Sequence, residues 1–151
     1  MREFNTSGPN VPEQHYTIER TELIRKGIKL IENERYFTIW APRQTGKSTY
    51  FRQLAEKLLT HGYKVAHINF EDYKQTPLQT FIERFVEQIN KFWKTNFEIT
   101  DISKIFNDIE RNNSYKYVLI IDEVEGINSE YFGSFLHSIR RVYHSRQNHC
   151  L

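Results

Sequence analysis

The sequence APRQTGKS occupies residues 41–48 and lies between a β-prone run and a helical pattern. The run before it, residues 36–40 (YFTIW), is rich in aromatic and β-branched residues, so we predict a strand there. Apolar residues at helical spacing follow up to the stop signal His61-Gly62, which predicts a helix over residues 47–60. A strand, a glycine-containing turn and a helix in this order are the context that a phosphate-binding loop requires.

The chemistry of such a loop assigns a role to each part of residues 44–49. Backbone N–H groups of the turn point inward at a phosphate, and the positive end of the helix adds to them. Gly46 permits the tight turn, the Lys47 ammonium bridges the β- and γ-phosphates, the Ser48 hydroxyl ligates Mg²⁺, and Thr49 reaches the α-phosphate. The predicted phosphate-binding residues are Arg43, Gln44, Thr45, Gly46, Lys47, Ser48 and Thr49.

One residue departs from the usual pattern of this loop. Ala41 stands where the first glycine is normally found, which is tolerable if that position does not need a positive φ. The alternative is that Gly46-Lys47-Ser48 is an ordinary turn opening a helix. The bare tripeptide fits that alternative, but the strand before it and the helix after it favour phosphate binding.

A second motif follows an apolar run at residues 117–121, which is typical of a strand covered on both faces. Asp122 and Glu123 come directly after it, at the strand end where ligands of parallel sheets bind. Asp122 is predicted to hold Mg²⁺ together with Ser48, and Glu123 to orient and polarise the attacking water. The alternative is a solvated acidic strand end without a function in catalysis.

The remaining pattern alternates strands with helices. Further helices are predicted over residues 18–33, 77–94, 101–112 and 129–144. The strand at 36–40 follows the first of these helices, and a strand at 64–70 follows the helix at 47–60. This alternation predicts an α/β fold with a parallel sheet. With the phosphate-loop motif in it, we expect the three-layer P-loop NTPase type. We expect an irregular lead-in over residues 1–16 and one ATPase domain over residues 17–151.

Composition excludes several other classes of protein. The chain has 151 residues, 26% of them charged, and a net charge of +2, which is too weak to indicate nucleic-acid or membrane-surface binding. A single cysteine, Cys150, excludes an internal disulfide and a multi-cysteine metal site. No apolar run approaches the length of a membrane span, and no targeting segment is visible, so we expect a cytoplasmic protein.

Two further clusters have competing interpretations. Glu71 and Asp72 follow the second predicted strand and could serve the metal site, but a solvated strand end on the far side of the sheet is favoured. Arg140, Arg141 and Arg146 form a basic patch on the last predicted helix. A nucleic-acid role is conceivable there, but a solvated helix face fits better.

Taken together, the APRQTGKS loop and the VLIIDEVEG segment resemble the prokaryotic AAA-like ATPases of the STAND/AAA+ group, in the ASCE division of P-loop proteins. The resemblance implies ATP and Mg²⁺ as cofactors. It assigns Lys47 and Ser48 to phosphate and magnesium, Asp122 to the metal and Glu123 to general base catalysis. The lead-in is similar to that of the family as well, which makes Asn10, Val11 and Tyr16 candidates for adenine contacts, with plain packing as the favoured alternative.

The resemblance also implies that this chain is an N-terminal fragment. In the family a sensor strand lies between the loop strand and the Asp-Glu strand, and it comes later in the chain than the last helix predicted here. Without that strand, residues 118–121 would have an unpaired edge that promotes self-association. We therefore expect weak nucleotide binding, slow hydrolysis and aggregation of the chain as it stands.

The predicted function is Mg²⁺-dependent ATP binding, with ATP hydrolysis in the complete protein. The alternative is a nucleotide-binding switch or scaffold without turnover, and a third class is a nucleic-acid remodelling subunit. The expected partner is a nucleoside triphosphate, with a protein partner or self-association in addition. A nucleic-acid partner is neither supported nor excluded by the sequence, and no membrane partner is expected.

Overall fold

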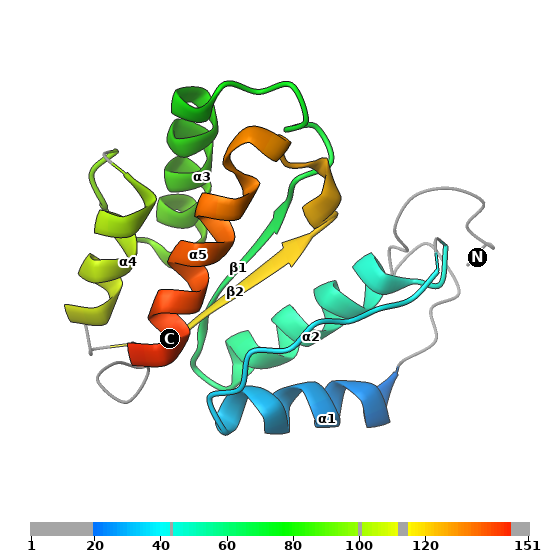
Figure 1. Cartoon of the computed structure of the whole chain (residues 1–151). Helices are drawn as coiled ribbons and strands as arrows, with labels where there is room; N and C mark the ends of the chain where they lie inside the picture. The colour runs from blue at the N-terminus through cyan, green and yellow to red at the C-terminus, as the bar shows by residue number, and fades with distance from the viewer. Residues whose placement is uncertain (1–19, 43, 100, 112–114, 146–151) are drawn as a thin grey trace. The chain divides into compact units, whose positions relative to one another are not determined.

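The computed structural model describes residues 20–42, 44–99, 101–111 and 115–145 of the chain (Figure 1). The lead-in predicted over residues 1–16, with its adenine contacts, lies outside these residues, as does Arg43. The chain divides into two compact units, Met1–Lys57 and Leu58–Leu151, and each is described by itself.

The first unit contains α1 (Thr21–Glu32) and the beginning of α2 (Lys47–Thr60). Gly27 of α1 lies against α2, since a Cβ atom there would come within 2.4 Å of the Tyr50 hydroxyl. The same hydroxyl donates a hydrogen bond to the Leu23 carbonyl at 3.2 Å. Gly27 weakens α1 by propensity, but it permits the close approach of the helix that follows the 41–48 loop.

The strand predicted over residues 36–40 is not formed, and that prediction is wrong. Residues 35–42 have no regular secondary structure, and Trp40 is 97% exposed. β-propensity describes how well a residue fits a pleated, half-buried surface, so it produces a strand only where a neighbouring strand is available. In the part of the chain that the structure describes, the sheet consists of β1 and β2, and neither pairs with residues 36–40.

The second unit is built on β1 (Lys64–Asn69) and β2 (Tyr117–Asp122), which confirms the strands predicted over 64–70 and 117–121. The two strands are parallel, and their register runs from Lys64 opposite Tyr117 to Asn69 opposite Asp122. The Phe70 N–H continues the pairing by donating to the Asp122 carbonyl at 3.0 Å. Both strands therefore end at the same edge of the sheet.

Three helices of this unit, α3 (Leu78–Trp93), α4 (Ile102–Arg111) and α5 (Ser129–Ser145), lie on the same side of the sheet (Figure 1). Ala66, Ile68, Leu119 and Ile121 alternate along the strands and join the apolar core that these helices form. The intervening residues, including His67, Asn69 and Asp122, share the opposite face. The unit is thus a mixed α/β arrangement with a small parallel sheet, compatible with a P-loop fold.

The helix α3 begins after a buried turn. Pro77 occupies its N-cap position in an extended conformation, and no side chain caps the helix. The buried Thr76 hydroxyl donates to the Asp72 carbonyl at 3.5 Å. Tyr131 of α5 donates to the Thr76 carbonyl at 2.8 Å, and burial raises the pKa of this phenol, which keeps the donor protonated.

Phe81 lies at the centre of the aromatic core, and its replacement tests how far the second unit depends on that core. Its ring is fully buried and lies 5.3 Å from Phe70 and 5.8 Å from Phe85 between centroids. We expect Phe81→Ala to lower the free energy of unfolding by about 3–5 kcal/mol, measured by urea denaturation. Phe92→Ala on the same helix is the control, because Phe92 is 43% exposed and its loss should cost less than about 1 kcal/mol.

Candidate functional site

In the loop at residues 41–48, two positions separated by one residue have positive backbone φ angles. Gln44 has φ of 59° and Gly46 has φ of 80°, and the Thr45 hydroxyl between them donates to the Pro42 carbonyl at 2.8 Å. Alternation of this kind turns successive N–H groups toward one side and forms a concave anion site. The phosphate-binding role of this loop stays a prediction.

Arg20 supports this loop from a distant position in the sequence, and sequence reasoning missed it. Its guanidinium donates to the Thr45 carbonyl, 25 residues further along the chain. A Cβ atom at position 46 would come within 2.8 Å of the same guanidinium. The positive φ is what favours glycine at position 46, and a side chain there would in addition displace the end of the Arg20 side chain. No short motif contains Arg20, so only the folded chain shows its role.

Lys47, Ser48 and Thr49 form the first turn of α2, directly after the loop. All three are partly buried, and the Lys47 Nζ atom donates to the Ala41 carbonyl at 3.0 Å across the loop. The helix begins with the Tyr50 N–H bonded to the Gly46 carbonyl at 2.9 Å, so earlier N–H groups of the turn are not used by the helix ladder. Ala41 does not have a positive φ, which explains why alanine is tolerated in place of glycine.

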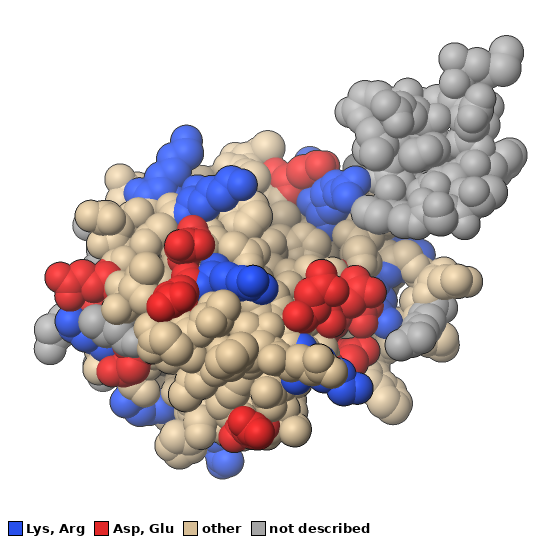
Figure 2. Space-filling model, turned by 90° about the horizontal axis from the view of Figure 1, so that it is seen from above, with Lys and Arg blue, Asp and Glu red and all other residues tan. Residues whose placement is uncertain are grey.

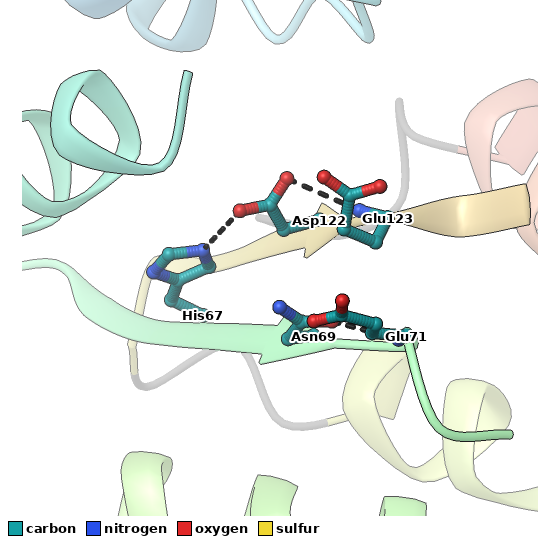
Figure 3. Close-up of polar contacts among 5 residues, drawn as sticks. All are labelled: His67, Asn69, Glu71, Asp122 and Glu123. Carbon is teal, nitrogen blue, oxygen red and sulfur yellow. Dashed lines mark hydrogen bonds and ion pairs between the residues drawn. The ribbon is translucent and has the colours of Figure 1, made fainter. Parts of the chain in front are cut away.

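In the second unit, Asp122 is the last residue of β2 and is 3% exposed. Its Oδ1 atom accepts the Glu123 N–H at 3.1 Å, and its Oδ2 atom lies 3.6 Å from His67 Nε2 (Figure 3). A buried carboxylate requires such polar neighbours, because removal from water destabilises the charged form. The aspartate is therefore held at the strand end by groups from both strands.

Glu123 follows with a strained backbone. Its φ and ψ are 51° and 48°, the left-handed region, and it precedes the short 3₁₀ helix η1 (Val124–Gly126). The Gly126 N–H closes this turn by donating to the Glu123 carbonyl at 2.9 Å. A non-glycine residue pays roughly 1–2 kcal/mol for this conformation, and such outliers gather at functional sites.

Gly126 holds that turn against the end of β1. A Cβ atom at position 126 would lie 2.1 Å from the Phe70 carbonyl oxygen and 2.7 Å from Glu71 Cα, so no side chain fits there. The close backbone contact fixes the turn that carries Glu123. The sequence gives no indication of this role beyond a glycine after two acidic residues, and the prediction did not include Gly126.

The end of β1 places further polar groups beside the acidic pair. Asn69 lies opposite Asp122 in the register, and its Oδ1 atom accepts the Glu71 N–H at 2.7 Å (Figure 3). Glu71 and Asp72 are both exposed, as expected for a solvated strand end, but β1 pairs directly with β2, so the prediction that this strand end lies on the far side of the sheet is wrong. Asn69 was not among the predicted site residues, although a polar residue at the end of each of two neighbouring strands would have indicated it.

Each unit contains one of the oxygen donors predicted to hold a cation, the Ser48 hydroxyl in the first unit and the Asp122 carboxylate in the second. These donors suit Mg²⁺, which favours oxygen ligands and normally completes its shell with phosphates and water. Among the described residues, no three His, Cys, Asp or Glu side chains form a cluster that could hold a metal by themselves.

The basic patch on α5 is partly structural. The Arg141 guanidinium donates to the Ser103 carbonyl at 3.1 Å and to Asn107 Oδ1 at 3.0 Å, which connects α5 to α4. Arg146 lies outside the described residues. Lysine and arginine alternate with acidic side chains over the face seen in Figure 2, and no broad basic field appears there. Within the described ranges, no helix has the length and apolar character needed to cross a membrane.

A turn of alternating hand before a helix, with an acidic pair after a parallel strand, is typical of P-loop nucleotide-binding proteins. A family model described as an AAA domain matches residues 33–150, which include both segments. The chain therefore belongs to the AAA domain family, and its resemblance to AAA-like P-loop ATPases is confirmed. No curated protein and no solved structure matches the chain. Membership indicates a nucleotide-binding, ATPase-like function in general terms.

Replacement of Gly126 tests whether the close contact with β1 fixes the turn at Glu123. Gly126→Ala should destabilise the protein by about 2–4 kcal/mol, since backbone atoms must shift to accommodate the methyl group. Gly133→Ala is the matched control, because nothing lies within 4 Å of a Cβ atom there. Alanine in the middle of α5 should stabilise by about 0.5–1 kcal/mol, and thermal and urea unfolding of both variants would measure the difference.

Proposed function

We propose that this protein binds Mg²⁺–ATP and, in its complete form, hydrolyses it to ADP and phosphate. The observation that carries the proposal is the loop of residues 44–48, whose positive φ angles at Gln44 and Gly46 lead directly into the N-terminus of α2 in a member of the AAA family. Residues 17–151 would make up the ATPase domain.

Binding would rest on the loop and on the first turn of α2. Backbone N–H groups of residues 44–48 would donate to phosphate oxygens, and the Arg43 and Thr49 side chains would contact the same triphosphate. The Lys47 ammonium would exchange its bond to the Ala41 carbonyl for the β- and γ-phosphates, where it neutralises charge. Magnesium, when bound, neutralises charge on the β- and γ-oxygens. Ser48 and Asp122 would hold it, Asp122 through water.

Hydrolysis would require the Glu123 carboxylate. It would accept a proton from a water molecule aligned with the γ-phosphate, so that the water oxygen attacks phosphorus as the bond to ADP breaks. The left-handed backbone of Glu123 supports this role, because the turn maintains a strained conformation at this carboxylate. The same residue argues against a nucleotide-binding scaffold without turnover.

Lys47→Ala tests the phosphate site. We expect it to weaken ATP binding by at least about a hundredfold, because a charge-assisted contact to a triphosphate is lost. Isothermal titration calorimetry with ATP and MgCl₂ would measure the affinity. Lys91→Ala, at an exposed position of α3, should bind ATP like the unaltered protein. Equal affinity for the Lys47 variant would reject the assigned site.

Glu123→Gln separates turnover from binding. The amide keeps the size of the side chain but does not accept the proton of water, so phosphate release should fall at least about a hundredfold with ATP affinity retained. Glu125→Gln, two residues further on and exposed, is the control and should release phosphate at the normal rate. If the unaltered protein binds ATP without releasing phosphate, the switch or scaffold is the correct function.

A further inference from the structure

The buried Asp122 carboxylate has a neighbour that the mechanism above does not use. One oxygen of the carboxylate accepts the Glu123 N–H, and the other faces the imidazole of His67 at 3.6 Å. Figure 3 shows the histidine reaching from β1 toward the aspartate on β2. The carboxylate is thus approached on each oxygen by a different group.

The sheet register brings the histidine to this place. His67 lies beside Ile120, and Asn69 lies beside Asp122, so His67 and Asp122 are diagonal neighbours on one face of the sheet. The His67 side chain is 26% exposed, but its Nε2 atom is buried next to the carboxylate. An alternating strand cannot move this side chain to the other face without a change of register.

We propose that His67 is a positioning residue that restrains the Asp122 carboxylate for Mg²⁺, an inference that rests on the proposed function. The separation of 3.6 Å is longer than a hydrogen bond, and a small side-chain movement would bring the imidazole within hydrogen-bond distance of the carboxylate. Outer partners of this kind orient carboxylates that serve metals, and their loss typically weakens metal affinity about 10–100-fold. A carboxylate with a hydrogen bond at one oxygen and an imidazole beside the other has fewer orientations open to it, so it would lose less rotational freedom when it takes up the hydrated cation.

The test measures how the affinity for nucleotide depends on the Mg²⁺ concentration. A fluorescent N-methylanthraniloyl derivative of ATP is titrated into the protein in EDTA and at a series of MgCl₂ concentrations. His67→Leu should raise the half-saturating Mg²⁺ concentration about tenfold and leave the affinity in EDTA unchanged. His67→Gln should recover most of the loss, because its amide Nε2 is a donor at a similar reach. His137→Leu, at an exposed position of α5, is the matched control.

A second arm identifies the residue through which His67 acts. In an Asp122→Asn background, His67→Leu should not raise the half-saturating Mg²⁺ concentration further, because the carboxylate that it restrains is gone. Urea unfolding of each variant accompanies the titrations, and the His67 variants should unfold cooperatively.

Each other outcome overturns the proposal. If His67→Leu weakens binding equally in EDTA and in MgCl₂, the histidine has a general structural role. If it changes neither, or if its effect persists in the Asp122→Asn background, His67 does not position Asp122, although the proposed function stands. If the unaltered protein and the His137 control do not bind the nucleotide, the proposed function fails and the inference fails with it.

Discussion

The parallel pairing of β1 with β2 is the constraint on which the acidic site depends. It ends both strands at one edge, with Asn69 beside Asp122, and it places His67 on the face that carries the aspartate. It also brings the end of β1 under the turn that follows β2, where the Gly126 backbone meets the Phe70 carbonyl. A slip of one residue in this register would turn His67 and Asn69 to the opposite face, toward the apolar core.

Both candidate segments, the 41–48 loop and the turn after β2, contain residues with positive backbone φ angles. In the 41–48 loop, Gln44 and Gly46 take positive φ angles, and in the second segment Glu123 does so immediately before η1. Each conformation is supported from outside the segment. The Arg20 guanidinium binds the loop at the Thr45 carbonyl, and the β1 end supports the turn after Glu123. Residues without a direct chemical role therefore maintain the geometry that the chemistry requires.

Short-range patterns in the sequence predicted most of the helices and both strands of the second unit. The helices α3 and α4 could be predicted because their apolar residues recur at helical spacing. The strand β2 could be predicted because residues 117–121 form a continuous apolar run. The run at 36–40 failed because β-branched and aromatic residues do not supply a neighbouring strand. The motif residues were identified from local spacing, whereas Arg20, His67 and Gly126 were not. Their roles arise from contacts between residues distant in the sequence, which no local pattern contains.

The left-handed backbone of Glu123 is less favourable for glutamate than for glycine, whereas the proposed hydrolysis needs the glutamate carboxylate. Glycine adopts φ of 51° without steric cost, and asparagine tolerates it better than glutamate does, so replacement by either relieves strain in the folded chain. Such a replacement also removes the carboxylate. Under the role in hydrolysis proposed for Glu123, folding would favour such replacements and only selection for turnover would oppose them. Under the same proposal, a lineage that no longer hydrolysed nucleotide would lose this glutamate early, and its descendants would retain a more relaxed turn.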